Sequence, residues 1–155
     1  MKKTKAELSK EIHASNLLRA KEIELCQSLW SDLVELEYAL ERIRVTLKFE
    51  CTEPDSGKRV KTCMKEWDEA LTKLRYGYEK ARLFLPDRLY TMFHNVSSLQ
   101  LSVVSEYSLQ MSNRQHVVPS YESFLEGLEK DWKILDEIFE AAAMEIHERF
   151  EKLKE

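Results

Sequence analysis

The residues best able to do chemistry in this chain of 155 residues are four histidines and three cysteines. A di-iron centre in a helical bundle needs Glu-x-x-His on two helices, because that spacing points a carboxylate and an imidazole at one metal. The positions three residues before the histidines hold instead Lys10, Thr91, Asn113 and Met144. The His-Glu-x-x-His motif of zinc peptidases does not occur either. The sequence therefore predicts no metal site of these kinds.

Looser pairings of the same residues stay open as alternatives. His13 and His147 would form a metal or pH-sensitive site if the start of the first helix lay beside the end of the last. Cys63 and His94 have the residue types of a thiol nucleophile and its base. Cys51 and Cys63 flank the first predicted loop and could pair under oxidation. We expect solvated histidines and, without a Cys-x-x-Cys motif, reduced thiols in a cytoplasm.

Several other functional classes are disfavoured by composition and motif. The three glycines, at 57, 77 and 127, are isolated, so no phosphate-binding loop is present, and no Gly-x-Ser-x-Gly elbow exists. A net charge of −4 argues against a nucleic-acid partner, which usually meets a basic stripe. No run of 18 apolar residues could span a membrane, and the basic start leads into no secretory signal. We expect a cytoplasmic protein that needs no cofactor and is not an enzyme.

A helical period of three and four recurs in four segments of the chain. It predicts helices over about 3–49, 59–85, 87–112 and 121–153, joined by loops at 51–58 and 113–120. Pro86 is placed at the first turn of the third helix. The clearest stripes are Cys26, Leu29, Leu33, Leu36, Leu40, Ile43 and Leu47 in the first segment and Leu125, Leu128, Trp132, Leu135, Phe139, Ala142 and Ile146 in the last. Trp30, Trp67 and Trp132 lie on or beside such stripes and are predicted core residues.

Four such helices with short loops predict a single all-α domain, an antiparallel up-down four-helix bundle with an extended first helix. At 1.5 Å per residue the first helix is roughly 70 Å long, whereas the others are roughly 40–50 Å. Residues 1–20 must therefore protrude, kink back, fray or find a partner. Leu8 and Ile12 continue an apolar stripe through this part, and Ser15 and Asn16 interrupt it.

The stretch VSSLQLSVVSEYSLQMS (96–112) holds one charge, Glu106, in a chain that is 34% charged. The period assigns Leu99, Val103, Tyr107 and Met111 to the core and leaves Ser97, Gln100 and Val104 on other faces. Small neutral side chains leave no charge to desolvate where another surface docks. We therefore predict an interface at Ser98, Leu101, Ser105 and Leu109, together with the N-terminal Leu8 and Ile12. A merely low-charge exposed helix is the alternative.

Two segments carry a family resemblance: LWSDLVELEYALERI (29–43) and YEKARLFLPDRLYTMF (78–93). Together they resemble uncharacterised bacterial helical proteins with a Leu-Trp, a leucine/alanine heptad and an element ending in Phe-x-Pro-x-x-Tyr. Phe84, Pro86 and Tyr90 follow that pattern except that Tyr90 comes four residues after the proline. The resemblance covers about a third of the chain; it implies a bacterial helical bundle and transfers no site.

The missing catalytic motifs and the neutral third helix favour a non-enzymatic interaction or scaffold bundle. Its expected partner is a second copy of the chain or another protein. The alternative is a sensor-type bundle that binds a small ligand between its helices, because bundle interiors can build such sites.

Overall fold

The structure is a computed structural model that describes residues 3–50, 56–112 and 121–155, with side chains over 3–48, 58–108 and 125–155. Its four helices are α1 (Lys5–Glu50), α2 (Ser56–Lys80), α3 (Asp87–Ser112) and α4 (Tyr121–Lys154). The described residues contain no strand, so the predicted all-α class is confirmed. None of these helices is both long and apolar enough to cross a membrane.

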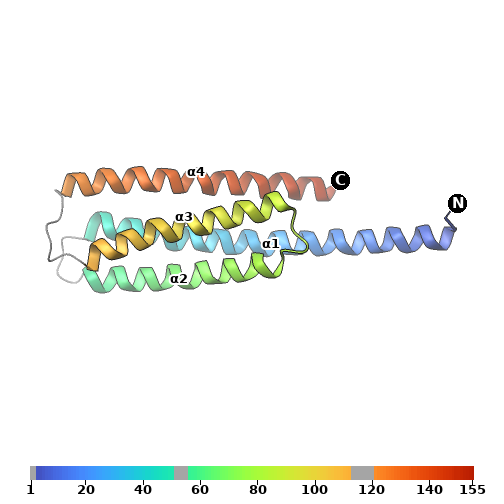
Figure 1. The fold of residues 1–155 in the computed structure, drawn as a ribbon, viewed down its shortest axis with the longest axis horizontal. Coiled ribbons are helices and arrows are strands. Elements are labelled where there is room, and N and C mark those ends of the chain that lie inside the picture. The colour runs from blue at the N-terminus through green and yellow to red at the C-terminus, as the bar shows by residue number, and fades with distance from the viewer. Residues whose placement is uncertain (1–2, 51–55, 113–120) are drawn as a thin grey trace.

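Each helix packs against two others, so that the four surround a common core (Figure 1). α1 and α3 both contact α2 and α4. Side-chain contacts between α1 and α2 join Thr46 to Cys63 near one end and Asp32 to Lys73 further along. The N-terminus of α1 and the C-terminus of α4 point to the same end in Figure 1.

The leucine stripe of α1 forms the centre of the core, as its spacing predicts. All seven of its predicted members are buried: Cys26, Leu29, Leu33, Leu36, Leu40, Ile43 and Leu47. Each buried leucine contributes about 1.5–3 kcal/mol through removal of its side chain from water. The largest fully buried partners from the other helices are Trp132, Tyr78 and Phe93.

The N-terminal part of α1 is helical without tertiary support. Residues 3–21 are exposed, and Figure 1 shows this part of α1 extending beyond the other three helices. Its first turn is closed by a reciprocal capping box, in which Glu7 N donates to Thr4 Oγ1 (3.2 Å) and Thr4 N donates to Glu7 Oε2 (2.9 Å). The short sequence Thr-Lys-Ala-Glu thus starts the helix locally. We call residues 5–21 the overhang.

The corner between α2 and α3 differs from the sequence prediction. α2 ends at Lys80 instead of continuing to Leu85, and a turn that buries Ala81 and Leu85 leads into α3. Tyr90 N donates to the carbonyl of Pro86 (3.1 Å), so Pro86 caps α3 from just outside its first turn. Pro86 has no N–H and restricts the residue before it, so a helix cannot continue without a break from α2 into α3.

The third helix is rotated relative to the prediction. Ser97, Gln100 and Val104 are buried, whereas Leu99 and Val103 are only partly buried. The prediction that Ser97, Gln100 and Val104 lie on outer faces is therefore wrong. Gln100 points inward because its Oε1 accepts a hydrogen bond from Trp67 Nε1 (3.0 Å). Part of the low charge of 96–112 is explained by this inward-facing polar side.

Candidate functional site

The predicted interface residues of α3 lie on its outer surface. Ser98, Leu101 and Ser105 are exposed, and Leu101 has 42% of its surface accessible. The predicted Leu109 belongs to α3, but its side chain lies outside the described part of the chain. The result on α3 is a small neutral strip with one exposed leucine.

The predicted interface residues of the overhang lie elsewhere. Leu8 and Ile12 are exposed on α1, and α1 packs against α2 and α4, not against α3. The overhang also extends beyond the end of the bundle (Figure 1). The structure therefore does not bring the two predicted sets into one surface, and any interface uses them separately.

A third surface, which the sequence did not predict, follows the seam between α1 and α4. One hollow of about 260 Å³ lies near the end of the bundle from which the overhang extends. It is lined by Cys26, Gln27, Trp30, Ala143, Ile146, His147 and Phe150. A second, of about 320 Å³, is lined by Val34, Glu37, Tyr38, Glu41 and Phe139. The rings of Trp30 and Phe139, 6.4 Å apart, join the two. We call this surface the α1–α4 groove.

Trp30 is the aromatic centre of the groove. With 41% of its surface accessible, it is not the core residue that the sequence predicts, whereas Trp67 and Trp132 are buried. The core stripe of α1 already fills the bundle interior. Trp30, which lies beside that stripe, is therefore on the surface, above the seam between α1 and α4. A tryptophan this exposed beside Phe139 is typical of a contact surface.

Beyond Trp30 the groove becomes acidic. Burial raises the pKa of Glu37 to about 7, and the charge of Asp136 and a hydrogen bond with it add to the effect, followed by the charges of Glu41 and Glu140. Glu37 Oε2 is buried, and no described group donates a hydrogen bond to it. Burial and the neighbouring carboxyl groups therefore keep Glu37 protonated up to about pH 7.

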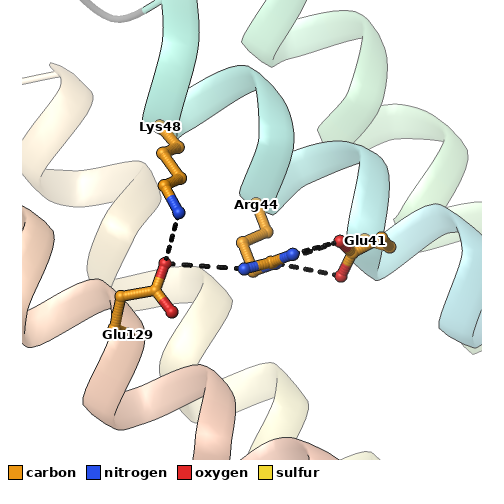
Figure 2. Close-up of polar contacts among 4 residues, drawn as sticks. All are labelled: Glu41, Arg44, Lys48 and Glu129. Atoms are coloured by element: carbon orange, nitrogen blue, oxygen red, sulfur yellow. Dashed lines mark hydrogen bonds and ion pairs between the residues drawn. The ribbon is translucent and has the colours of Figure 1, made fainter.

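A cation network closes the far end of the groove (Figure 2). Arg44 Nε donates to both carboxylate oxygens of Glu41 (3.1 and 3.0 Å), and Lys48 Nζ lies 3.1 Å from Glu129 Oε1 on α4. Arg44 also reaches that oxygen at 3.5 Å. Glu41 is thereby neutralised, whereas no ion pair reaches Glu37 from a described side chain. The carboxyl groups of Glu37, Asp136 and Glu140 together form the acidic part of the groove.

An ion pair joins α1 to α4 at the end of the bundle from which the overhang extends. Arg149 donates from Nε and Nη2 to the two oxygens of Glu22 (2.6 and 3.1 Å). Beside it, burial raises the pKa of the Cys26 thiol, the charge of Glu22 raises it further, and Arg149 opposes them. A thiol held in its protonated form is a poor nucleophile.

The structure brings together neither His13 with His147 nor Cys63 with His94. His147 lies beside Cys26, about 20 Å along the helix from His13, because 13 residues of α1 separate the two positions. Cys63 is buried against Thr46, whereas His94 is exposed and stacks on Tyr90. Cys51, and with it the pairing with Cys63, falls outside the described residues. The described side chains include no group of three that could hold a metal.

Comparison with known proteins adds no family. No family model, curated protein or solved structure matches the chain. The resemblance to bacterial helical proteins stays a prediction.

One sequence signal could have found the groove. On α1, Leu8, Ile12, Arg19, Ile23 and Trp30 follow one another at steps of 4, 7, 4 and 7, which places them on one face. This second stripe runs beside the core stripe, through both the overhang and the groove. Considering the overhang and the bundle as separate segments hides it.

Proposed function

We propose that this chain is a non-enzymatic interaction or scaffold protein of the cytoplasm that associates with itself. We infer an antiparallel up-down bundle as its frame. Contacts that pair Thr46 with Cys63 and Asp32 with Lys73 support opposite directions for α1 and α2. Contacts of Glu22 with Arg149 and of Lys48 with Glu129 support the same for α1 and α4.

The observation that carries the proposal is the uncovered apolar face of the overhang. Leu8, Ile12 and Leu18 are all exposed on the overhang, the part of α1 in which every residue is exposed. Single exposed leucines are normal on a protein surface, but Leu8 and Ile12 lie four residues apart and share one face of the helix. Covering them with a partner removes apolar area from water, at about 25 cal/mol per Å².

The outer strip of α3 supports the same function in a second place. Ser98, Leu101 and Ser105 present small neutral side chains, and a docking partner need not strip water from a charge there. The overhang and the α3 strip lie on different parts of the molecule. A scaffold with two separate surfaces could hold one partner at each.

The experiment is the solution mass by light scattering of the full chain, residues 21–155 and Leu101→Glu. We expect an oligomer for the full chain and a smaller species for at least one of the two variants. Leu83→Glu is the matched control, because Leu83 is 93% exposed at the α2–α3 corner. A full chain that is monomeric at every concentration would refute self-association.

Ligand sensing is the second candidate, and one observation favours it. Ser97 Oγ and Trp132 Nε1 are buried without a hydrogen-bond partner in the described structure. Buried polar atoms usually have hydrogen-bond partners, so a small polar molecule bound between the helices could supply the missing hydrogen bonds. Thermal stabilisation by members of a metabolite panel, lost in Trp132→Phe, would favour this function over the first.

A further inference from the structure

The overhang and the α1–α4 groove use the same face of one helix. The stripe Leu8, Ile12, Arg19, Ile23 and Trp30 continues without a change of phase from the exposed part of α1 into the groove. Two copies of a helix that meet antiparallel about a twofold axis present the same face to each other. This face carries apolar residues both in the overhang and in the groove. In an antiparallel pair the apolar residues of one copy's overhang would therefore meet those of the other copy's groove.

A single register satisfies the strongest features of both halves. Suppose that the twofold axis crosses the two copies of α1 at the level of Lys21. Residues that are equally far before and after Lys21 in the sequence then face each other across the two copies. Ile12 and Trp30 are each nine residues away, and Leu8 and Val34 are each thirteen. This register also sets Ser15, one of the two polar residues that interrupt the overhang stripe, opposite the polar Gln27 of the groove lining.

Charge selects the same register. Residues 3–21 hold five basic and two acidic side chains, a net charge of +3 with neutral histidine. The groove beyond Trp30 holds Glu37, with Asp136 and Glu140 acting on it from α4. Lys5 and Glu37 are each sixteen residues from Lys21, so the basic start of the overhang reaches the unpaired carboxyl. The ammonium group of Lys5 would give the Glu37 carboxyl the positively charged partner that no described side chain of the single chain provides.

The lengths and the position of the overhang also agree. The overhang spans about 25 Å, and the stretch of α1 from Cys26 to Glu41 that lines the groove spans about 23 Å, at 1.5 Å per residue. The overhang leaves the bundle at the end where the groove begins, at Cys26 and Phe150 (Figure 1). Two bundles placed end to end can therefore each lend a helix to the other.

We propose that two copies of this chain assemble end to end, and that the overhang of each lies as a fifth helix in the α1–α4 groove of the other. Ile12 packs on Trp30 of the second copy, Leu8 packs on Val34, and Lys5 pairs with Glu37. This inference rests on the proposed function of self-association and names its surface. The α3 strip stays free in this assembly.

The first test is a zero-length carbodiimide cross-link on the unmodified full chain, mapped by mass spectrometry. We expect a peptide that joins Lys5 to Glu37. The two residues lie about 48 Å apart along one helix, so only a second copy can bring them together. A cross-link from Lys5 to acidic residues outside the groove, with none to Glu37, would overturn the register.

The second test compares two leucine-sized exposed positions on opposite faces of the overhang. Ile12 is 62% exposed on the docking face, and Leu17 is 59% exposed on the other face. We expect Ile12→Glu to be monomeric and Leu17→Glu to stay dimeric by light scattering. Both variants should keep the native helix content, because neither residue contacts the bundle core.

The outcomes separate this inference from the proposed function. A dimer that survives Ile12→Glu but is lost in Leu101→Glu would overturn the fifth-helix arrangement and keep self-association through α3. A full chain that is monomeric at all concentrations would overturn both. A dimer lost in Ile12→Glu, kept in Leu17→Glu and cross-linked from Lys5 to Glu37 is the expected result.

Discussion

Trp67 on α2 donates its indole N–H to Oε1 of Gln100 on α3, at 3.0 Å, inside the bundle. Both residues are buried, so each satisfies a polar group that water cannot reach. This bond sets how α3 turns toward the core, and through that which residues of 96–112 stay on the surface.

We expect Gln100→Leu to lower the free energy of unfolding by about 1–3 kcal/mol, because it leaves the indole N–H of Trp67 buried without an acceptor. Trp67→Phe combined with Gln100→Leu should cost less than the two single changes added together, since no polar group is then stranded. Urea unfolding of the four proteins measures this coupling. Strictly additive changes would show that the bond does not position α3.

The raised pKa of Glu37 predicts how stability depends on pH. The native state keeps this carboxyl protonated up to about pH 7, whereas the unfolded chain loses the proton near 4.5, the ordinary pKa of a glutamate side chain. Stability from this group is complete below pH 4.5 and is lost as pH rises through 7. We expect Glu37→Gln to raise the free energy of unfolding at pH 8 by about 1–3 kcal/mol, after allowance for partial solvent screening.

The measurement is urea unfolding from pH 5 to pH 8 in the Ile12→Glu background, which removes any contribution from assembly. Glu137→Gln is the control, since Glu137 is an exposed carboxylate of α4. An unchanged pH profile in Glu37→Gln would show that Glu37 is ionised in the native protein throughout this range.

Two glycines within helices should respond oppositely to alanine. At Gly127 of α4 an added Cβ meets no atom within 4 Å, so Gly127→Ala should stabilise the protein by about 0.5–1 kcal/mol through helix propensity. At Gly77 of α2 the new Cβ would lie 3.2 Å from Leu29 Cδ2, and Leu29 is buried in the core. Gly77→Ala should therefore lower the melting temperature. A gain of equal size at both positions would show that α1 and α2 can move apart freely.

The capping box at the tip of α1 should control the overhang alone. Thr4→Ala removes the acceptor for Glu7 N and should weaken the first turns by about 1 kcal/mol. We expect faster amide hydrogen exchange over residues 5–12 and an unchanged melting temperature of the bundle. Ser9→Ala, at an exposed position outside the cap, is the control. Exchange that is equally fast in the original protein would mean that the cap does not hold the overhang helical.

The sequence by itself determined the four helices and the core of α1. Seven apolar residues at alternating steps of three and four can lie on only one face, and all seven are buried. The excess length of α1 was equally predictable, because it follows from the rise per residue. The capping box between Thr4 and Glu7 also follows from the local sequence Thr-x-x-Glu alone.

The rotation of α3 was decided only by the tertiary structure. Positions 103 and 104 of α3 are both valine, so either Leu99 and Val103 or Gln100 and Val104 could be the pair that faces the core. The choice depends on which side chains of the neighbouring helices lie opposite α3. The buried Trp67 supplies an N–H that Gln100 can accept and that leucine cannot. A periodicity that scores apolar residues alone assigns such an inward glutamine to the surface.

The groove likewise depended on tertiary structure. Trp30 lies next to the core stripe, and only the packing of α4 beside α1 determines whether it is covered. The pKa of Glu37 rises because α1 and α4 bring together carboxyl groups almost a hundred residues apart in the chain. Local spacing determines which face of a helix is apolar, whereas burial and charge at its edges depend on the neighbours that the fold places there.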